Sequence, residues 1–199
     1  ISLPDSIQYI SDRGFANCGG LKEITLPDGL TRIGVEAFVG CTNLTDVKMP
    51  DSVHIIRDNA FKGCTSLTSV EIPEGVKIIQ DGAFKSCTGL TSITLPGSLT
   101  AIGDSAFSNC KELTSITVPK GVTSIGSNPF SSCSALTEIN IPSTVNYIGS
   151  HAFYGCSLIS SIVIPNGVIY IHESTFEKCS SLTTVTMPSR VKTIEDCAF

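Results

Sequence analysis

Nine cysteines and three histidines are the side chains of this 199-residue chain that could bind a metal ion or act as nucleophiles. Eight of the cysteines, from Cys18 to Cys179, recur every 23 residues. No C-x-x-C pair occurs, which is the spacing typical of zinc and redox sites. Cysteines at the same position of neighbouring repeats would have Cβ atoms about 4.8 Å or more apart, beyond the usual disulfide range of about 3.5–4.5 Å. We therefore expect a buried column of reduced thiols, with Cys197 outside it.

The three histidines, His54, His151 and His172, occupy three different positions in the chain's repeat. A metal or catalytic site needs side chains that converge, so we expect solvated surface histidines. No G-x-S-x-G or S-x-x-K motif surrounds a serine, and no glycine-rich segment has the context of a phosphate-binding loop. Acids one repeat apart, such as Asp51 and Glu74, follow from the preference of turns for acids after proline. The sequence predicts no enzyme activity, no cofactor and no metal site.

A strict repeat positions all of these side chains. Nine of the ten prolines are spaced 23 residues apart: Pro4, Pro27, Pro50, Pro73, Pro96, Pro119, Pro142, Pro165 and Pro188. All nine phenylalanines, from Phe15 to Phe199, share this spacing. The unit reads P-x-x-[VLI]-x-x-I-x-x-x-A-F-x-x-C-x-x-L-x-x-[IV]-x-[LIVM]. About eight and a half copies follow one another without insertion, so we expect residues 1–199 to form a single domain.

Each unit predicts two short extended segments. The stretch L-x-x-[IV]-x-[LIVM]-P alternates apolar and polar residues, which is typical of a half-buried strand that ends at proline. Pro-Asp-Gly at 27–29 fits a type I turn, and a second extended piece follows, as at 122–126. The A-F-x-x-C stretch has room for one helical turn, which we expect to be of the 3-10 type. Because one unit cannot cover its own apolar face, stacked units must share a continuous core.

Composition narrows the range of partners. The hydrophobic share is 41% and the charged share 16%, which suits a packed core. The net charge of −5 repels phosphate backbones, so nucleic acid is not an expected partner. No apolar run is long enough to predict a membrane span. The chain begins at Ile1 and stops mid-repeat at Phe199, so we expect a fragment of a longer protein, whose uncapped ends could make end-to-end contacts.

The repeat resembles the BspA-like leucine-rich repeats, whose 23-residue consensus is L-x-x-[IL]-x-[LI]-P-x-x-[LV]-x-x-I-x-x-x-A-F-x-x-C. The likeness covers the whole chain; Gly14, Pro129 and Thr175 replace the alanine, and Ile159 replaces a leucine. The resemblance implies an α/β fold, a right-handed leucine-rich-repeat superhelix (solenoid) with a parallel concave sheet and short 3-10 or helical turns. It also implies a secreted or surface protein, since several such proteins are adhesins for host matrix proteins or other cells. It transfers no ligand, because the signature residues are core residues.

The side chains outside the repeated core are the ones that could bind a partner. Two residues before each proline, the outward strand position forms a varied row that includes Lys48, Glu71, Thr94, Thr117, Asn140 and Val163. Threonine suits strands and keeps them soluble, so this row has a purely structural interpretation. The functional interpretation is an adaptable hydrogen-bonding surface for a protein or a glycan.

A second candidate surface contains tyrosine. Three of the four tyrosines, Tyr147, Tyr154 and Tyr170, fall within 24 residues. Tyr147 and Tyr170 occupy the same slot in adjacent repeats, so we expect their rings to stack about 5 Å apart. Ile169 replaces a polar residue beside them, and exposed apolar groups often mark a partner site. We predict a patch of Tyr147, Ile169 and Tyr170; drift of two repeats without function would give the same residues.

The sequence thus predicts an extracellular, adhesin-like module that binds protein and belongs to a secreted or surface protein. One alternative is a structural spacer with no ligand of its own, which uniform repeats would favour and a distinct exposed patch would disfavour. A remote alternative is a threonine array that binds ice or another regular surface. Curvature of the sheet disfavours that array.

Overall fold

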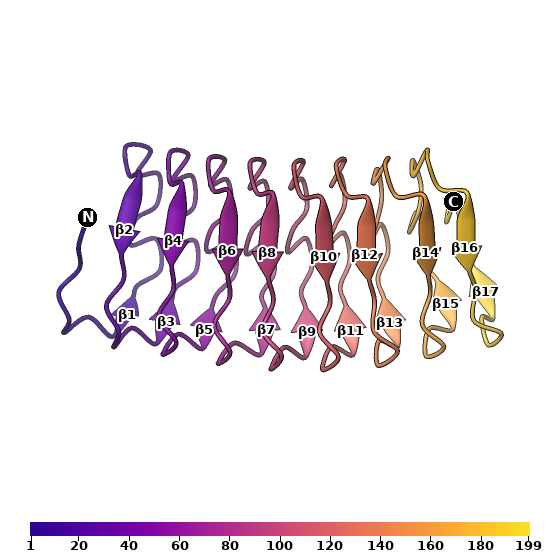
Figure 1. Ribbon diagram of the computed structural model, residues 1–199, viewed down its shortest axis with the longest axis horizontal. Coiled ribbons are helices and arrows are strands. Elements are labelled where there is room, and N and C mark those ends of the chain that lie inside the picture. Colours follow the sequence, from indigo (N-terminus) through magenta and orange to yellow (C-terminus); the bar gives the residue numbers. More distant parts are fainter.

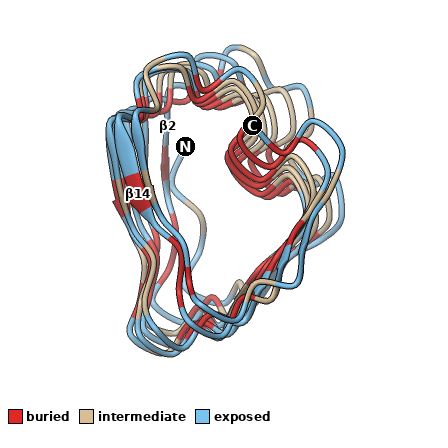
Figure 2. Cartoon of the chain, turned by 90° about the vertical axis from the view of Figure 1, so that its right-hand side faces the viewer, coloured by how far each residue is buried: buried red, intermediate tan, exposed pale blue.

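The computed structural model describes all 199 residues as one stack of turns, each turn one repeat long. In Figure 1 the turns follow one another in a nearly straight row, with the two ends of the chain at opposite ends of the stack. Seventeen strands of two or three residues alternate along the chain. The view down the stack in Figure 2 shows the turns superimposed in a closed outline, with the buried residues on its inner side.

The L-x-x-[IV]-x-[LIVM] segment of each repeat contains a three-residue strand. Its apolar middle residue faces the core and both neighbours are exposed, as the alternation predicts. The strands pair in parallel with an offset of one repeat, for example Ser69 opposite Ser92. They are β2 (Glu23–Thr25), β4 (Asp46–Lys48), β6 (Ser69–Glu71), β8 (Ser92–Thr94), β10 (Ser115–Thr117), β12 (Glu138–Asn140), β14 (Ser161–Val163) and β16 (Thr184–Thr186). We call the surface formed by their outward residues the strand face.

The second extended segment of each repeat forms a two-residue strand that ends at the repeated isoleucine. These strands are β1 (Tyr9–Ile10), β3 (Arg32–Ile33), β5 (Ile55–Ile56), β7 (Ile78–Ile79), β9 (Ala101–Ile102), β11 (Ser124–Ile125), β13 (Tyr147–Ile148), β15 (Tyr170–Ile171) and β17 (Thr193–Ile194). They pair in parallel as β1–β3–β5, β7–β9–β11–β13 and β15–β17. The ladder is therefore interrupted between β5 and β7 and between β13 and β15.

The A-F-x-x-C segment is not helical, so the expected α/β class with 3-10 or helical turns is wrong. The chain is a β-solenoid whose strands are joined by turns. Hydrogen bonding explains the difference, because the Phe38 amide donates to Ala60 O of the next repeat over 2.7 Å, while the Cys41 amide bonds three residues back to Phe38 O over 3.1 Å. Glu36 and Gly40 have φ angles of 54° and 69°. A right-handed helix contains no such left-handed residues.

One hydrophobic core of 52 buried residues runs along the stack. The phenylalanine rings form a column in which neighbouring centroids lie 5.1–5.7 Å apart and ring planes are inclined by at most 16°. This spacing follows from the repeat, which places one ring in every turn at the same depth. The core therefore has the same composition in each turn, and it gives every turn the same shape.

Two departures from the consensus alanine keep the contacts of the stack, although Pro129 loses the amide bond that Ala106 makes three residues back. Pro129 lacks an amide hydrogen, but its carbonyl still accepts the Phe107 amide over 2.9 Å, which keeps the contact between turns. The buried hydroxyl of Thr175 donates to His172 O over 2.7 Å. Each substitution thus preserves the bonding between or within turns.

Candidate functional site

The abundant serine and threonine side chains fall into two groups with different surroundings. Hydroxyls in the turns donate to backbone carbonyl oxygens one repeat back, as Thr91 Oγ1 does to Thr68 O over 3.0 Å, and the pattern recurs along the chain. The strand-face hydroxyls of Thr94 and Thr117 are exposed and make no hydrogen bond within the chain. The turn hydroxyls are thus committed to the fold, whereas the strand-face hydroxyls are free to bond another molecule.

The strand face carries one line of outward side chains along the stack. Each is the exposed third residue of its strand, and neighbours are one repeat apart, as with Glu71 opposite Thr94. The predicted binding residues on this line are Lys48, Glu71, Thr94, Thr117, Asn140 and Val163. The structure therefore brings six of the nine candidate residues onto one face.

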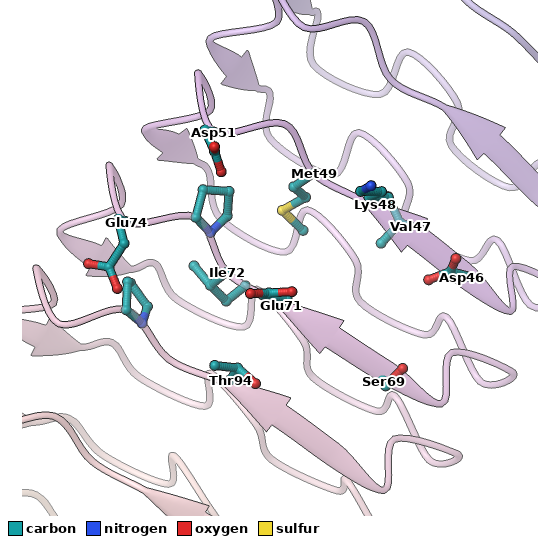
Figure 3. Close-up of a pocket in the computed structure, with 12 residues that line it drawn as sticks. Asp46, Val47, Lys48, Met49, Asp51, Ser69, Glu71, Ile72, Glu74 and Thr94 are labelled. Carbon is teal, nitrogen blue, oxygen red and sulfur yellow. The ribbon is translucent and has the colours of Figure 1, made fainter.

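The strand face is hollowed along much of its length, with depressions of about 440 Å³ beside Thr94 and Thr117 and beside Thr117 and Asn140 as well as in its N-terminal half. A depression of about 430 Å³ lies over β4, β6 and β8, and Figure 3 shows Lys48, Glu71 and Thr94 among the side chains that line it. Asp51 and Glu74, which follow the strands in the proline turns, line the same depression. Turn preference explains why acids follow proline, but it does not predict that they share a hollow with the strand row.

The same half of the strand face is acidic. A second depression of about 370 Å³ lies over β2 and β4 and shares Asp46 and Lys48 with the first. The carboxylates that line the two depressions are Glu23, Asp28, Asp46, Asp51, Glu71 and Glu74, and Lys48 is the single basic residue among the lining side chains. None of these six carboxylates forms a salt bridge. From β10 to β16, by contrast, the strands contain a single acid, Glu138, and Val163 is 63% exposed.

Tyr147 and Tyr170 lie on a different face, which the two-residue strands form. They are the first residues of β13 and β15 and are 45% and 42% exposed. The expected stacking of one tyrosine on the other is not seen, because each ring packs against His172, with centroids 5.4 Å apart for Tyr147 and 6.0 Å for Tyr170. β13 and β15 lack the ladder that holds other neighbours in register. Ile169, the third residue of the predicted patch, is half-buried.

His172 is the candidate residue that sequence reasoning missed. A solvated histidine is expected there, yet its side chain is 22% exposed and its Nδ1 lies 3.1 Å from Glu195 Oε1. Oε2 of Glu195 accepts the Glu173 amide hydrogen over 3.0 Å. The available signal is the spacing, because His172 follows Tyr170 by two residues and extended segments place such residues on one side. We call Tyr147, Tyr170, His172 and Glu195 the tyrosine–histidine cluster.

The remaining histidines lie outside this cluster. His54 is exposed. The ring of His151 lies 5.9 Å from that of Tyr154, and Lys178 Nζ lies 4.6 Å from the centroid of the same tyrosine. No three histidine, cysteine or acidic side chains are grouped so that they could hold a metal ion. The structure also has no helix with the length and apolar character needed to cross a membrane.

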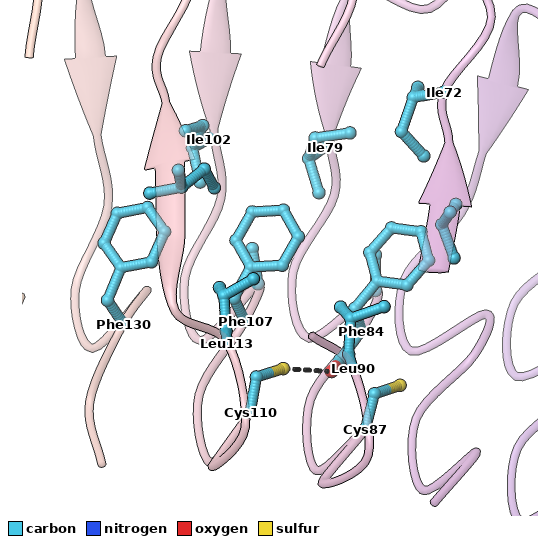
Figure 4. Close-up of a cluster of buried hydrophobic side chains, with 14 of the residues drawn as sticks. Ile72, Ile79, Phe84, Cys87, Leu90, Ile102, Phe107, Cys110, Leu113 and Phe130 are labelled. Atoms are coloured by element: carbon cyan, nitrogen blue, oxygen red, sulfur yellow. Dashed lines mark hydrogen bonds between the residues drawn. The ribbon is translucent and has the colours of Figure 1, made fainter. Parts of the chain in front are cut away.

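The repeated cysteines form the predicted column with one exception. All are free thiols, and those from Cys41 to Cys179 are buried, whereas Cys18 is exposed because no earlier turn of this chain covers it. Each buried thiol donates to the carbonyl of a phenylalanine in the preceding turn, as Cys110 Sγ does to Phe84 O over 3.2 Å (Figure 4). Burial raises the pKa of Cys110 well above its ordinary value, so this thiol stays protonated and unreactive near neutral pH. Cys197 is also exposed.

Comparison with known proteins finds a family profile that matches the repeats and several similar structures. The profile of the BspA type leucine-rich repeat region matches residues 1–114 and 77–199, in six copies. A leucine-rich repeat protein from Bacteroides ovatus is similar in structure, with a TM-score of 0.78 and 30% identity over 99% of this chain, which spans 64% of that protein. A leucine-rich cell surface protein from Faecalibacterium prausnitzii has a TM-score of 0.68 and 31% identity, over 100% of this chain and 69% of its own. No curated protein matches the chain.

A third structure shares the fold alone. A leucine-rich repeat protein from Eubacterium ventriosum has a TM-score of 0.60 at 20% identity, over 100% of this chain and 75% of its own. The matched family segments together cover every residue from 1 to 199. They contain the repeated proline, phenylalanine and cysteine positions on which the stack of turns depends. The chain belongs to the BspA-type leucine-rich repeat family.

Proposed function

We propose that this chain is an adhesin-like module that binds protein outside the cell, as part of a secreted or surface protein. The observation that carries the proposal is the strand face, whose exposed threonines form no bonds within the fold and whose carboxylates form no salt bridges. The relative from Faecalibacterium prausnitzii is described as a cell surface protein, which supports the location. Because the acidic half of the face carries six carboxylates and one lysine, we infer a partner that presents lysine and arginine side chains.

A structural spacer remains the main alternative. A spacer needs only the core, and the core residues recur in every turn, so its outer surface has no reason to differ from one end to the other. The strand face does differ, since it is acidic over β2 to β6 and nearly neutral from β10 to β16. This change in charge favours a binding surface over a spacer.

A threonine array for ice or another regular surface has less support. Such an array needs an uninterrupted lattice of identical side chains. In the outer strand row, Thr94 and Thr117 are the only threonines in adjacent strands, and the neighbouring positions hold Lys48, Glu71, Asn140 and Val163. The row is therefore too irregular to match a lattice.

Binding of the purified chain to immobilised fibronectin, laminin and type I collagen tests the proposal. We expect binding to at least one of them, weakened about tenfold or more by the combined changes Asp46→Asn, Glu71→Gln and Glu74→Gln, and weakened by added salt. Glu112→Gln is the control, because this exposed acid lines neither depression. Unchanged binding by the triple variant would move the site to the tyrosine–histidine cluster. Lack of binding to all three proteins would support the spacer.

A further inference from the structure

The two tyrosines of the tyrosine–histidine cluster leave a large part of their ring surface exposed. In the phenylalanine column each ring lies nearly parallel to the next, with planes inclined by at most 16°. The Tyr147 ring is inclined by 53° to the His172 ring, and the Tyr170 ring stacks on one side of His172 with centroids 6.0 Å apart and planes inclined by 23°. Both tyrosines keep more than two-fifths of their surface exposed. A planar group from another molecule therefore has ring surface available to it.

The cluster lies at one of the two interruptions in the ladder of two-residue strands, the one between β13 and β15. The His172 ring against Tyr147 is a side-chain contact between these two turns, and the bond to Glu195 ties His172 to the next turn, that of β17. These contacts hold the side chains in place before a ligand arrives, which lowers the entropy cost of binding.

One carboxylate, that of Glu195, lies within the cluster, 3.1 Å from His172 Nδ1. The neighbouring sequence is also acidic, because 170–173 and 192–196 contain Glu173 and Asp196 as well, against one lysine, Lys192. Each oxygen of Glu195 accepts one hydrogen bond within the chain, and a carboxylate offers about four acceptor positions in all. The cluster thus combines free acceptors, negative charge and exposed aromatic surface.

We propose that the tyrosine–histidine cluster binds the guanidinium group of an arginine side chain on a partner protein. Guanidinium is planar and cationic, so it stacks on a tyrosine ring while its N–H groups bond to a carboxylate. An ammonium group has the charge without the plane, and a neutral amide has the plane without the charge. The inference rests on the proposed role in protein binding, because it names the group that a partner presents to this second face.

The test uses the whole chain with 13C-labelled tyrosine rings. The chain has four tyrosines and no tryptophan, so Tyr9 and Tyr154 are internal controls for the two tyrosines of the cluster. The probe is the peptide acetyl-Gly-Arg-Gly-amide, and the matched peptide contains neutral citrulline in place of arginine. We expect the arginine peptide to shift the Tyr147 and Tyr170 signals with a Kd on the order of 1–10 mM, and the citrulline peptide to bind at least about tenfold more weakly.

Two variants sharpen the assay. Glu195→Gln should weaken arginine binding about tenfold, because it removes the charge, whereas Glu112→Gln should leave it unchanged. A shift of the Tyr9 and Tyr154 signals in Glu195→Gln without peptide would indicate a wider change in the fold. In that case Tyr147→Leu, a change at an exposed ring, replaces this variant and should likewise weaken binding. Equal affinity for arginine and citrulline, equal shifts at all four tyrosines, or no shift up to about 20 mM peptide would overturn the proposal. These results are independent of the matrix-protein assay, because its triple variant changes only residues that line the depressions.

Discussion

The interior columns and the surface rows of this stack obey the same repeat but behave differently. Phenylalanine rings one repeat apart stack at 5.1–5.7 Å from one end to the other. Tyr147 and Tyr170 are also one repeat apart, yet each packs on His172 and not on the other tyrosine. The same spacing in the sequence therefore fixes a contact in the core and leaves it undetermined on the surface.

The difference lies in what surrounds each side chain. A core ring is enclosed on every side, so the ring in the next turn is the only partner that fills its space at close-packed density. A surface ring has solvent as an alternative, so its contact depends on which side chain its own repeat or the next one places beside it. Identical core residues thus specify the solenoid, while departures from the repeat at the surface distinguish one region from another.

The largest expected effect is a loss of stability at alkaline pH, which the buried thiols should cause and the exposed thiols should not. Burial raises the pKa of Cys87 and of Cys133 to about 12, whereas an unfolded thiol ionises near 8.5–9. Below that pH both states hold the proton and stability is unaffected. As the pH rises from about 9 toward 12, only the unfolded chain loses these protons, so the free energy of unfolding should fall by about 1.4 kcal/mol per pH unit for each such thiol.

Urea unfolding at a series of pH values between 7 and 11 measures this decline. The variant Cys87→Ala/Cys133→Ala should be less stable at pH 7 and should lose stability with a shallower slope above pH 9. Cys18→Ala/Cys197→Ala is the matched control, because both residues are exposed, and its slope should equal that of the parent chain. Equal slopes for all three proteins would contradict a buried column of protonated thiols.

Removal of one aromatic ring should lower the free energy of unfolding far more in the phenylalanine column than at a surface tyrosine. Phe107→Ala leaves a cavity between two stacked neighbours and should lower the free energy of unfolding by about 3–5 kcal/mol. Tyr170→Ala removes a ring that is 42% exposed, so we expect a loss of about 1 kcal/mol or less. Urea denaturation followed by circular dichroism measures both. Comparable losses would mean that the surface aromatic contacts stabilise the stack as much as the core does.

Much of the fold can be predicted from the sequence because the core repeats without a gap. The period alone places Phe84 beneath Phe107 and Ser69 beside Ser92, as the structure confirms. The conformation of the A-F-x-x-C segment could not be predicted in the same way. Its length suits a helical turn, but left-handed residues such as Gly40 and amide bonds to the next repeat give a different conformation. Those bonds depend on stacked neighbours, which propensities within one repeat do not include.

The candidate sites were predictable only in part. Alternation along the strand places Lys48 and Glu71 outward, and both lie on the strand face. The depressions were not foreseen, since they depend on how the turn acids Asp51 and Glu74 stand beside the strand row. The period places Glu195 beside His172, 23 residues away at the same position of the next turn, but the pair was missed because the residue type at this position changes from one repeat to the next. Surface contacts between unlike residues leave no mark on the repeat.

The smallest expected effect compares two nearby threonines, one whose hydroxyl is hydrogen-bonded within the chain and one whose hydroxyl is not. Thr91 Oγ1 donates to Thr68 O over 3.0 Å, whereas Thr94 on the strand face makes no side-chain hydrogen bond. Thr91→Val should therefore lower the free energy of unfolding by about 0.5–1 kcal/mol, near the lower limit for a hydrogen bond. The loss is small because Thr68 O also accepts the Thr91 amide over 2.8 Å and so keeps a partner. Thr94→Val should change stability by about 0.3 kcal/mol or less, since valine suits a strand as well as threonine does. Thermal and urea unfolding of both variants beside the parent chain would measure the gap, and a larger loss for Thr94→Val would show that the strand-face hydroxyls serve the fold.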